Sequence, residues 1–144
     1  MAKYKSRATR CSEACSVITE DVQAKLEEIA SELRDGSLNI SAAKVSLGNL
    51  LIDTSTFEEL KDEIENWKSN MEGTNLESTN KYQEVNDCFD ALDYAISNLE
   101  SVDLAIEIVE ESNIEIVAQD IDDLATQIET AISDLGGVEF PGMY

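Results

Sequence analysis

The sequence contains no histidine, and its last basic residue is Lys81. Without histidine, a serine or cysteine nucleophile has no imidazole base beside it, which excludes nucleophilic catalysis of that kind. A zinc site normally needs four cysteine or histidine ligands, and only three cysteines occur. Most enzyme classes are therefore disfavoured, and we expect no enzymatic activity, no cofactor and no metal site.

Helix breakers and long apolar runs are also scarce. The 144 residues include one proline and six glycines, which favours long, uninterrupted helices. No apolar run approaches the length of a membrane-spanning helix, about 18 residues. The basic first residues are not followed by the apolar segment of a secretory signal. We therefore expect one soluble domain.

The three cysteines are Cys11, Cys15 and Cys88, and an odd number argues against a disulfide framework. Cys11 and Cys15 are four residues apart, so they share one face of a helix. Free cysteines are commonly buried as small apolar residues, and we expect that role here. A reactive thiol at Cys11, next to Arg10, is the alternative.

Charge is divided unevenly along the chain. The formal net charge is −21, and residues 82–144 hold sixteen Asp and Glu with no Lys or Arg. Residues 1–10 hold four bases and no acid. A surface this negative repels nucleic acid and anionic lipid, and it attracts proteins that bind phosphates. The apolar content of 42% is too high and too regularly spaced for a disordered acidic tail.

Apolar residues recur at spacings of three and four, which is the period of an amphipathic helix. This pattern predicts an all-α fold of antiparallel helical hairpins or a bundle with coiled-coil-like seams, either within one chain or completed as a dimer. In the second helix, Leu50 and Leu51 are expected to face inward. The expected helices are residues 11–35, about 39–52, 55–72, 80–99, 102–109 and 114–135.

Residues 104–117 fit two structures. Apolar residues alternate in 104–108 and in 114–116, a pattern typical of a β-hairpin. We favour helix, because the flanking segments are helical and a lone hairpin is marginally stable.

The chain divides into three parts. These are a basic, flexible tip at 1–10, a helical bundle at 11–135 and an extended tail at 136–144. The four bases of the tip are too few for a nucleic-acid-binding surface. We expect them to be disordered or to strap onto an acidic surface. They are Lys3, Lys5, Arg7 and Arg10.

Acidic side chains lie off the apolar rows of the two C-terminal helices. An ordinary solvated helix face mixes Lys with Glu and gathers cations at its C-terminus, and here both features are missing. B-form DNA carries one charge per ~1.7 Å of axis, so a rigid rod with outer carboxylates can imitate it. The alternative is a solvated face without a partner. The residues expected to stand in for phosphates are Asp87, Asp90, Asp93, Glu115, Asp122, Asp123 and Glu129.

Three short segments carry a family resemblance. They are Ser6-Arg7-Ala8-Thr9-Arg10, Trp67-Lys68-Ser69-Asn70-Met71 before a turn, and Phe140-Pro141-Gly142-Met143-Tyr144. Together they resemble small acidic all-helical proteins encoded by tailed bacteriophages and prophages. The resemblance implies a viral origin and a helical form, and it transfers no catalytic residue.

Two functions remain open. The first is a phage-encoded acidic interaction protein that inhibits a host nucleic-acid-binding or defence factor, by DNA mimicry, in the host cytoplasm. Its partner is a protein with a basic, nucleic-acid-binding surface, and it contacts neither nucleic acid nor membrane directly. The second is a structural or assembly protein of the virion that oligomerises through its heptad seams.

Overall fold

The chain folds into helices alone over the residues that are described. The computed structural model describes residues 6–106 and 113–141, and these contain no β-strand. The predicted all-α fold is therefore confirmed. None of the described helices combines the length and the apolarity that crossing a membrane requires. In chain order the elements are α1 (Arg7–Ile18), the π-helix η1 (Thr19–Gln23), α2 (Ala24–Asp35), α3 (Ile40–Gly48), α4 (Ser55–Met71), the 3-10 helix η2 (Asn75–Ser78), α5 (Asn80–Glu100) and α6 (Ile114–Gly136).

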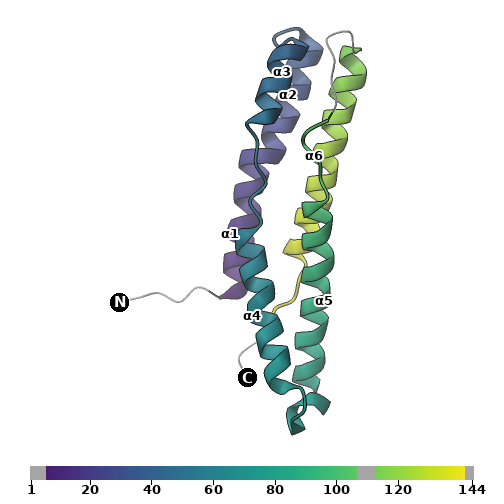
Figure 1. The fold of residues 1–144 in the computed structure, drawn as a ribbon. Coiled ribbons are helices and arrows are strands. Elements are labelled where there is room, and N and C mark those ends of the chain that lie inside the picture. The colour runs from purple at the N-terminus through teal and green to yellow at the C-terminus, as the bar shows by residue number, and fades with distance from the viewer. Residues whose placement is uncertain (1–5, 107–112, 142–144) are drawn as a thin grey trace, which may run out of the picture.

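The helices form an elongated antiparallel bundle (Figure 1). α1, η1 and α2 follow one another as a single rod, and the chain returns through α3 and α4. α5 then runs back beside α4. α6 contacts α1, η1, α2 and α5, while α4 contacts α1 and α5. The core at the middle of the bundle is therefore surrounded by α1, α4, α5 and α6.

Local sequence signals set several helix ends. The side chain of Ser6 accepts a hydrogen bond from the N–H of Thr9 (3.1 Å), and that of Asn39 accepts one from the N–H of Ala42 (2.8 Å). Such caps satisfy amides that a first helical turn leaves free. α2 ends at Asp35, and the φ of 85° at the next residue, Gly36, lies in the left-handed region that favours glycine.

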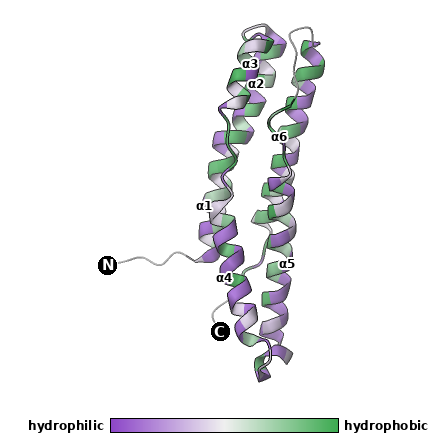
Figure 2. Cartoon of the chain, in the orientation of Figure 1, coloured by the Kyte–Doolittle hydropathy of each residue, from purple (hydrophilic) through white to green (hydrophobic). Residues whose placement is uncertain are grey.

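One continuous apolar core runs through the bundle. Apolar residues recur every three or four positions among polar ones, so each long helix has an apolar side; Figure 2 shows both kinds along every helix. In α6, Ala118 and Ala125 are buried beside Val117, Ile121 and Leu124. These alanines make the buried face of α6 wider than a two-in-seven coiled-coil seam, and a wide face is typical of helices in globular bundles. α6 can therefore pack against helices on two sides.

The second predicted helix, 39–52, is too long. α3 ends at Gly48, because glycine and the asparagine after it both disfavour helix, and residues 49–54 continue without helix. The prediction that Leu51 faces inward is wrong, since 79% of this residue is exposed.

The predicted helix at 102–109 is wrong where the structure describes it. Residues 102–106 form neither helix nor strand. The side chain of Asp103 accepts a hydrogen bond from the N–H of Ala105 (2.9 Å). Such a local bond gives the backbone an alternative to the helix.

The hairpin alternative for 104–117 is not formed in its second arm, because Ile114 begins α6. The side chain of Asn113 accepts hydrogen bonds from the N–H groups of Glu115 (2.9 Å) and Ile116 (3.2 Å). This cap favours helix from the next residue onward. Residues 107–112 lie outside the described residues.

The N-terminal segment differs from the flexible tip expected at 1–10, because α1 already begins at Arg7. Arg7 Nε donates to Glu63 Oε1 (3.0 Å), and Arg10 Nη2 donates to Glu63 Oε2 (2.7 Å). Both arginines therefore hold α1 against α4, as the strap alternative proposed. Residues 1–5 lie outside the described residues.

Loss of a buried α6 side chain should destabilise the bundle strongly. Ile121 is 0% exposed, so Ile121→Ala leaves a cavity and should lower the free energy of unfolding by about 2–5 kcal/mol. Ile116 on the same helix is 61% exposed and provides the control, because Ile116→Ala should change that free energy by less than about 0.5 kcal/mol. Urea unfolding followed by circular dichroism measures both variants, and equal losses would contradict this core.

The ion pairs of Glu63 should make stability depend on pH. Hydrogen bonds from Arg10 and then Arg7 hold the pKa of Glu63 below its ordinary value of 4.5. A carboxyl pKa that is depressed by folding adds stability above the unfolded-state pKa, and this stability is lost as pH falls through the folded-state pKa. Because these side chains are partly exposed, Glu63→Gln should cost at most about 1 kcal/mol at pH 7. Urea unfolding across the acid range should show the difference vanish, and a pH-independent difference would contradict this account.

Candidate functional site

The three candidate acids of α5 are exposed but not equivalent. Asp93 lies beside α4, where Lys61 Nζ is 3.3 Å from its Oδ1. Asp87 accepts a hydrogen bond from Gln83 Nε2 (2.8 Å), one turn earlier on the same helix. Within residues 6–106 and 113–141, Asp87 and Asp90 have no ion pair. α5 therefore contributes two carboxylates whose charge is not compensated.

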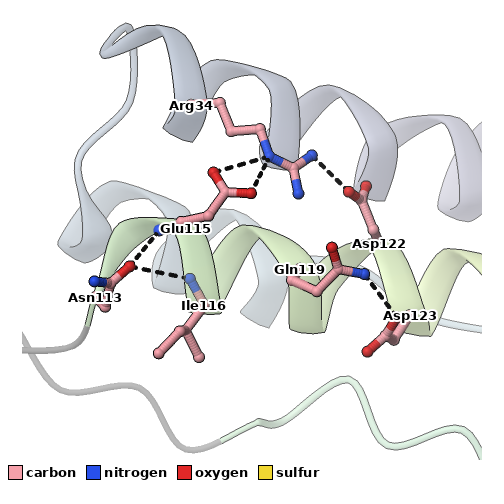
Figure 3. A network of polar contacts seen from close by, with 7 residues as sticks. All are labelled: Arg34, Asn113, Glu115, Ile116, Gln119, Asp122 and Asp123. Atoms are coloured by element: carbon pink, nitrogen blue, oxygen red, sulfur yellow. Dashed lines mark hydrogen bonds and ion pairs between the residues drawn. The ribbon is translucent and has the colours of Figure 1, made fainter.

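Two candidate acids of α6 are held by a cation from α2. Arg34 Nε donates to Glu115 Oε1 (3.1 Å), and its Nη1 donates to Asp122 Oδ2 (Figure 3). The three side chains are 33–68% exposed, so each pair contributes little to stability. They still neutralise part of the charge. Glu115 and Asp122 therefore belong to the α2–α6 interface and not to a free outer row.

The last two candidate acids of α6 lie on different rows of the helix. Glu129 is seven residues after Asp122, so it shares the row that faces the rod of α1 and α2. Asp123 lies on another row and accepts a hydrogen bond from Gln119 Nε2 (3.0 Å) (Figure 3). The structure thus does not bring the seven predicted residues together on one face.

Two further exposed acids of α6 were not predicted as site residues. Asp120 and Asp134 lie 3 and 11 residues from Asp123, and both spacings return close to the same row of a helix. All three residues are exposed. The sequence contains this row as well as the row of Glu115 and Asp122. Only the position of α2 in the fold shows which row has its charge compensated, because Arg34 of α2 pairs with Glu115 and Asp122.

Ion pairs cross three of the helix interfaces, and the interface between α5 and α6 is one that has none among the described residues. Arginines join α1 to α4 and α2 to α6, and Lys61 joins α4 to α5. No ion pair crosses from α5 to α6 in the described part of the chain, because Lys81 at the start of α5 is the last base. Five of the exposed acids of these two helices have no ion pair among the described residues and lie off the row of Glu115 and Asp122, and we call these five the acidic face. It consists of Asp87, Asp90, Asp120, Asp123 and Asp134.

A groove borders the acidic face where the chain leaves α6. Its volume is about 400 Å³, and it is lined by Glu84 and Asp87 of α5 and by residues 137–141. Residues 138–141, which belong to the predicted extended tail, form no helix. Glu139 adds a third carboxylate to this lining. A side chain with an apolar stem and a positive end, such as lysine or arginine, suits such a groove.

The cysteines are buried and act as packing residues. Burial raises the pKa of the Cys88 thiol to about 11. A hydrogen bond with Cys15, together with burial, raises the pKa of Cys11, and the same hydrogen bond lowers the pKa of the buried Cys15 thiol. A thiol with a raised pKa stays protonated and is a weak nucleophile, which disfavours a reactive Cys11. Among the described residues, no group of three or more His, Cys, Asp or Glu is placed to hold a metal ion.

Comparison with known proteins identifies no relative. No protein-family model, no curated protein and no solved structure matches this chain. Its function must therefore be argued from its own residues.

Removal of the α2 cation should destabilise the chain in a salt-dependent way. Arg34→Gln leaves Glu115 and Asp122 as neighbouring negative charges, so it should lower the free energy of unfolding slightly at low salt. The loss should shrink at high salt, because screening weakens repulsion between exposed charges. Lys25→Gln removes one positive charge without removing an ion pair seen among the described residues, and it serves as the control. Thermal unfolding at two salt concentrations measures both, and equal losses in the two variants would contradict the role of Arg34.

Proposed function

We propose that this chain is an acidic interaction protein that occupies the nucleic-acid-binding surface of another protein. The observation that carries the proposal is the acidic face. Its five carboxylates are exposed and have no ion pair in the described part of the chain. A partner with Lys and Arg placed to bind phosphates would supply the missing counter-charges.

The dimensions of α5 and α6 suit a partner that tracks a nucleic-acid backbone. With 21 and 23 residues and a rise of 1.5 Å per residue, the helices extend about 32 and 35 Å. Carboxylates on such helices are fixed by the bundle core and do not need to be ordered on binding. The charge spacing is sparser than the one charge per ~1.7 Å of B-form DNA. In the proposed mimicry, the chain therefore imitates the negative sign and the linear arrangement of the phosphate charges, and not their density.

The net charge of −21 favours rapid capture of such a partner. Opposite fields steer two proteins together and raise the association rate, and this effect weakens with salt. From the three short segments that resemble small acidic phage proteins, we propose further that the partner is a host protein. We therefore propose inhibition of a host nucleic-acid-binding or defence factor, in the host cytoplasm.

An assembly role in the virion is less well supported. The apolar rows of α5 and α6 are buried within one chain, so they are not free to pair with other copies. Oligomerisation would have to use other surfaces.

A charge-matched pair of variants tests the proposed function. The first variant replaces four acids of the acidic face by their uncharged isosteres, as Asp87→Asn, Asp90→Asn, Asp120→Asn and Asp123→Asn. The control removes the same number of charges elsewhere, as Glu27→Gln, Glu28→Gln, Asp62→Asn and Glu65→Gln, all at exposed positions.

The immobilised chain is presented with a heparin-purified fraction of bacterial DNA-binding proteins, and bound protein is eluted with duplex DNA. We expect specific capture by the wild type and by the control, displacement by DNA, and loss of capture in the acidic-face variant. Binding should weaken as the salt concentration rises, because salt screens the attraction between the carboxylates and the basic partner. Equal capture by both variants, or bound protein that DNA does not displace, would refute the proposal.

A further inference from the structure

α4 begins at the level of the bundle where α5 ends. The segment before α4 and the segment after α5 are not helical. Thr54 Oγ1, just before α4, donates a hydrogen bond to Glu100 Oε2 at the end of α5 (3.1 Å). From this level, residues 49–53 and 102–106 run along the bundle without helix (Figure 1). The two segments border a groove with a volume of about 420 Å³.

This groove has an apolar lining that is open to solvent. Leu51 on its rim is 79% exposed, the largest exposed fraction among the large hydrophobic residues of 6–106 and 113–141. Leu50, Ile52 and Leu104 are half-buried and pack against the core. The floor of the groove is thus continuous with the core, while Leu51 has little cover of its own. An occupant with apolar side chains could bury this surface.

The two segments also present free main-chain groups. In the described part of the chain, the N–H groups of Leu51, Ile52 and Leu104 donate no hydrogen bond, and the carbonyl oxygens of the same residues accept none. The two segments do not pair with each other as strands. Free amides and carbonyls on a non-helical segment can pair with an added extended chain. These groups therefore favour an extended occupant over a helical one.

The charge around the groove selects the kind of occupant. Glu100 and Asp103 line the groove, and Asp53 precedes Thr54 on the opposite side. Burial, and then the neighbouring Glu100 carboxyl, raise the pKa of the nearby Glu58. These acids would repel a second copy of a chain whose net charge is −21. They would attract lysine and arginine.

We propose that this groove docks an extended segment of the partner protein, in which two apolar side chains at i and i+2 are flanked by Lys or Arg. The apolar pair lies on one side of the extended segment and covers Leu51 and the half-buried leucines. The flanking cations meet Glu100 and Asp103. This inference rests on the proposed function, since it assigns to the same basic partner a second contact that is apolar.

A substitution that adds a negative charge in the groove separates apolar docking from simple charge attraction. The probe is a fluorescent peptide, Lys-Arg-Val-Thr-Val-Arg-Lys, with blocked ends. Leu51→Asp adds negative charge, so attraction alone would strengthen binding, whereas loss of the apolar contact should weaken it by about tenfold. The control is Val45→Asp on α3, which makes the same change at a residue 66% exposed outside the groove lining, and it should not weaken binding. Circular dichroism verifies that both variants keep the helical fold.

Three changes to the peptide test the remaining contacts. A peptide with both valines replaced by serine keeps the charge and should bind about tenfold more weakly. A peptide with its cations replaced by glutamate should not bind measurably. A peptide N-methylated at the central threonine loses a main-chain donor and should bind more weakly than its parent.

Several results would overturn the docking proposal. They are equal binding by wild type and Leu51→Asp, equal binding of the serine and valine peptides, no binding of the parent peptide, and a self-associated state of the free protein that Leu51→Asp abolishes in sedimentation. None of these results involves the acidic-face residues. If they occurred while DNA still displaced captured protein from the wild type, the docking proposal would fail and the proposed function would stand.

Discussion

The packing of α6 against two different neighbours is the interaction on which the rest of the structure depends. α6 contacts the rod of α1, η1 and α2 on one side and α5 on the other, and its face reaches both because Ala118 and Ala125 widen it. Without this contact the rod would be joined to the α4–α5 hairpin only through α1 and α4. Apolar burial at α6 must also offset the mutual repulsion in a chain whose net charge is −21.

The few cations of the chain are placed where helices from distant parts of the sequence meet. Arg7 and Arg10 join α1 to α4, Arg34 joins α2 to α6, and Lys61 joins α4 to α5. Each pair is partly exposed and weak by itself, yet together they relieve repulsion at three interfaces. The interface between α5 and α6 has no such relief in the described part of the chain. The charge of its outer carboxylates is therefore not compensated within the chain, and we propose that a basic partner binds them.

The acidic face and the groove beside Leu51 contribute different physical terms to the proposed recognition. Exposed carboxylates act at long range and set the rate and the salt dependence of encounter. Apolar burial acts only in contact and is insensitive to screening. A partner that combined both would be selected for more than its positive charge. This matters for an acidic protein, because charge alone attracts every basic surface in a cell.

The sequence by itself determined the helical class, most helix boundaries and the inward rows, because apolar spacing and glycine act locally along the chain. It also determined that α6 has no cation of its own. Only the tertiary structure decided which acids are free. Glu115, Asp122 and Asp93 look as exposed in the sequence as Asp87, Asp90 and Asp123, but their compensation depends on Arg34 and Lys61, which are distant in sequence and reach them only through packing. The non-helical segments at 49–54 and 102–106 were equally hidden. The apolar residues of 49–52 fit a helical pattern, whereas those of 104–108 alternate and fit helix or strand. Gly48 ends the helix before the first segment, and in the second the side chain of Asp103 accepts a hydrogen bond from the N–H of Ala105.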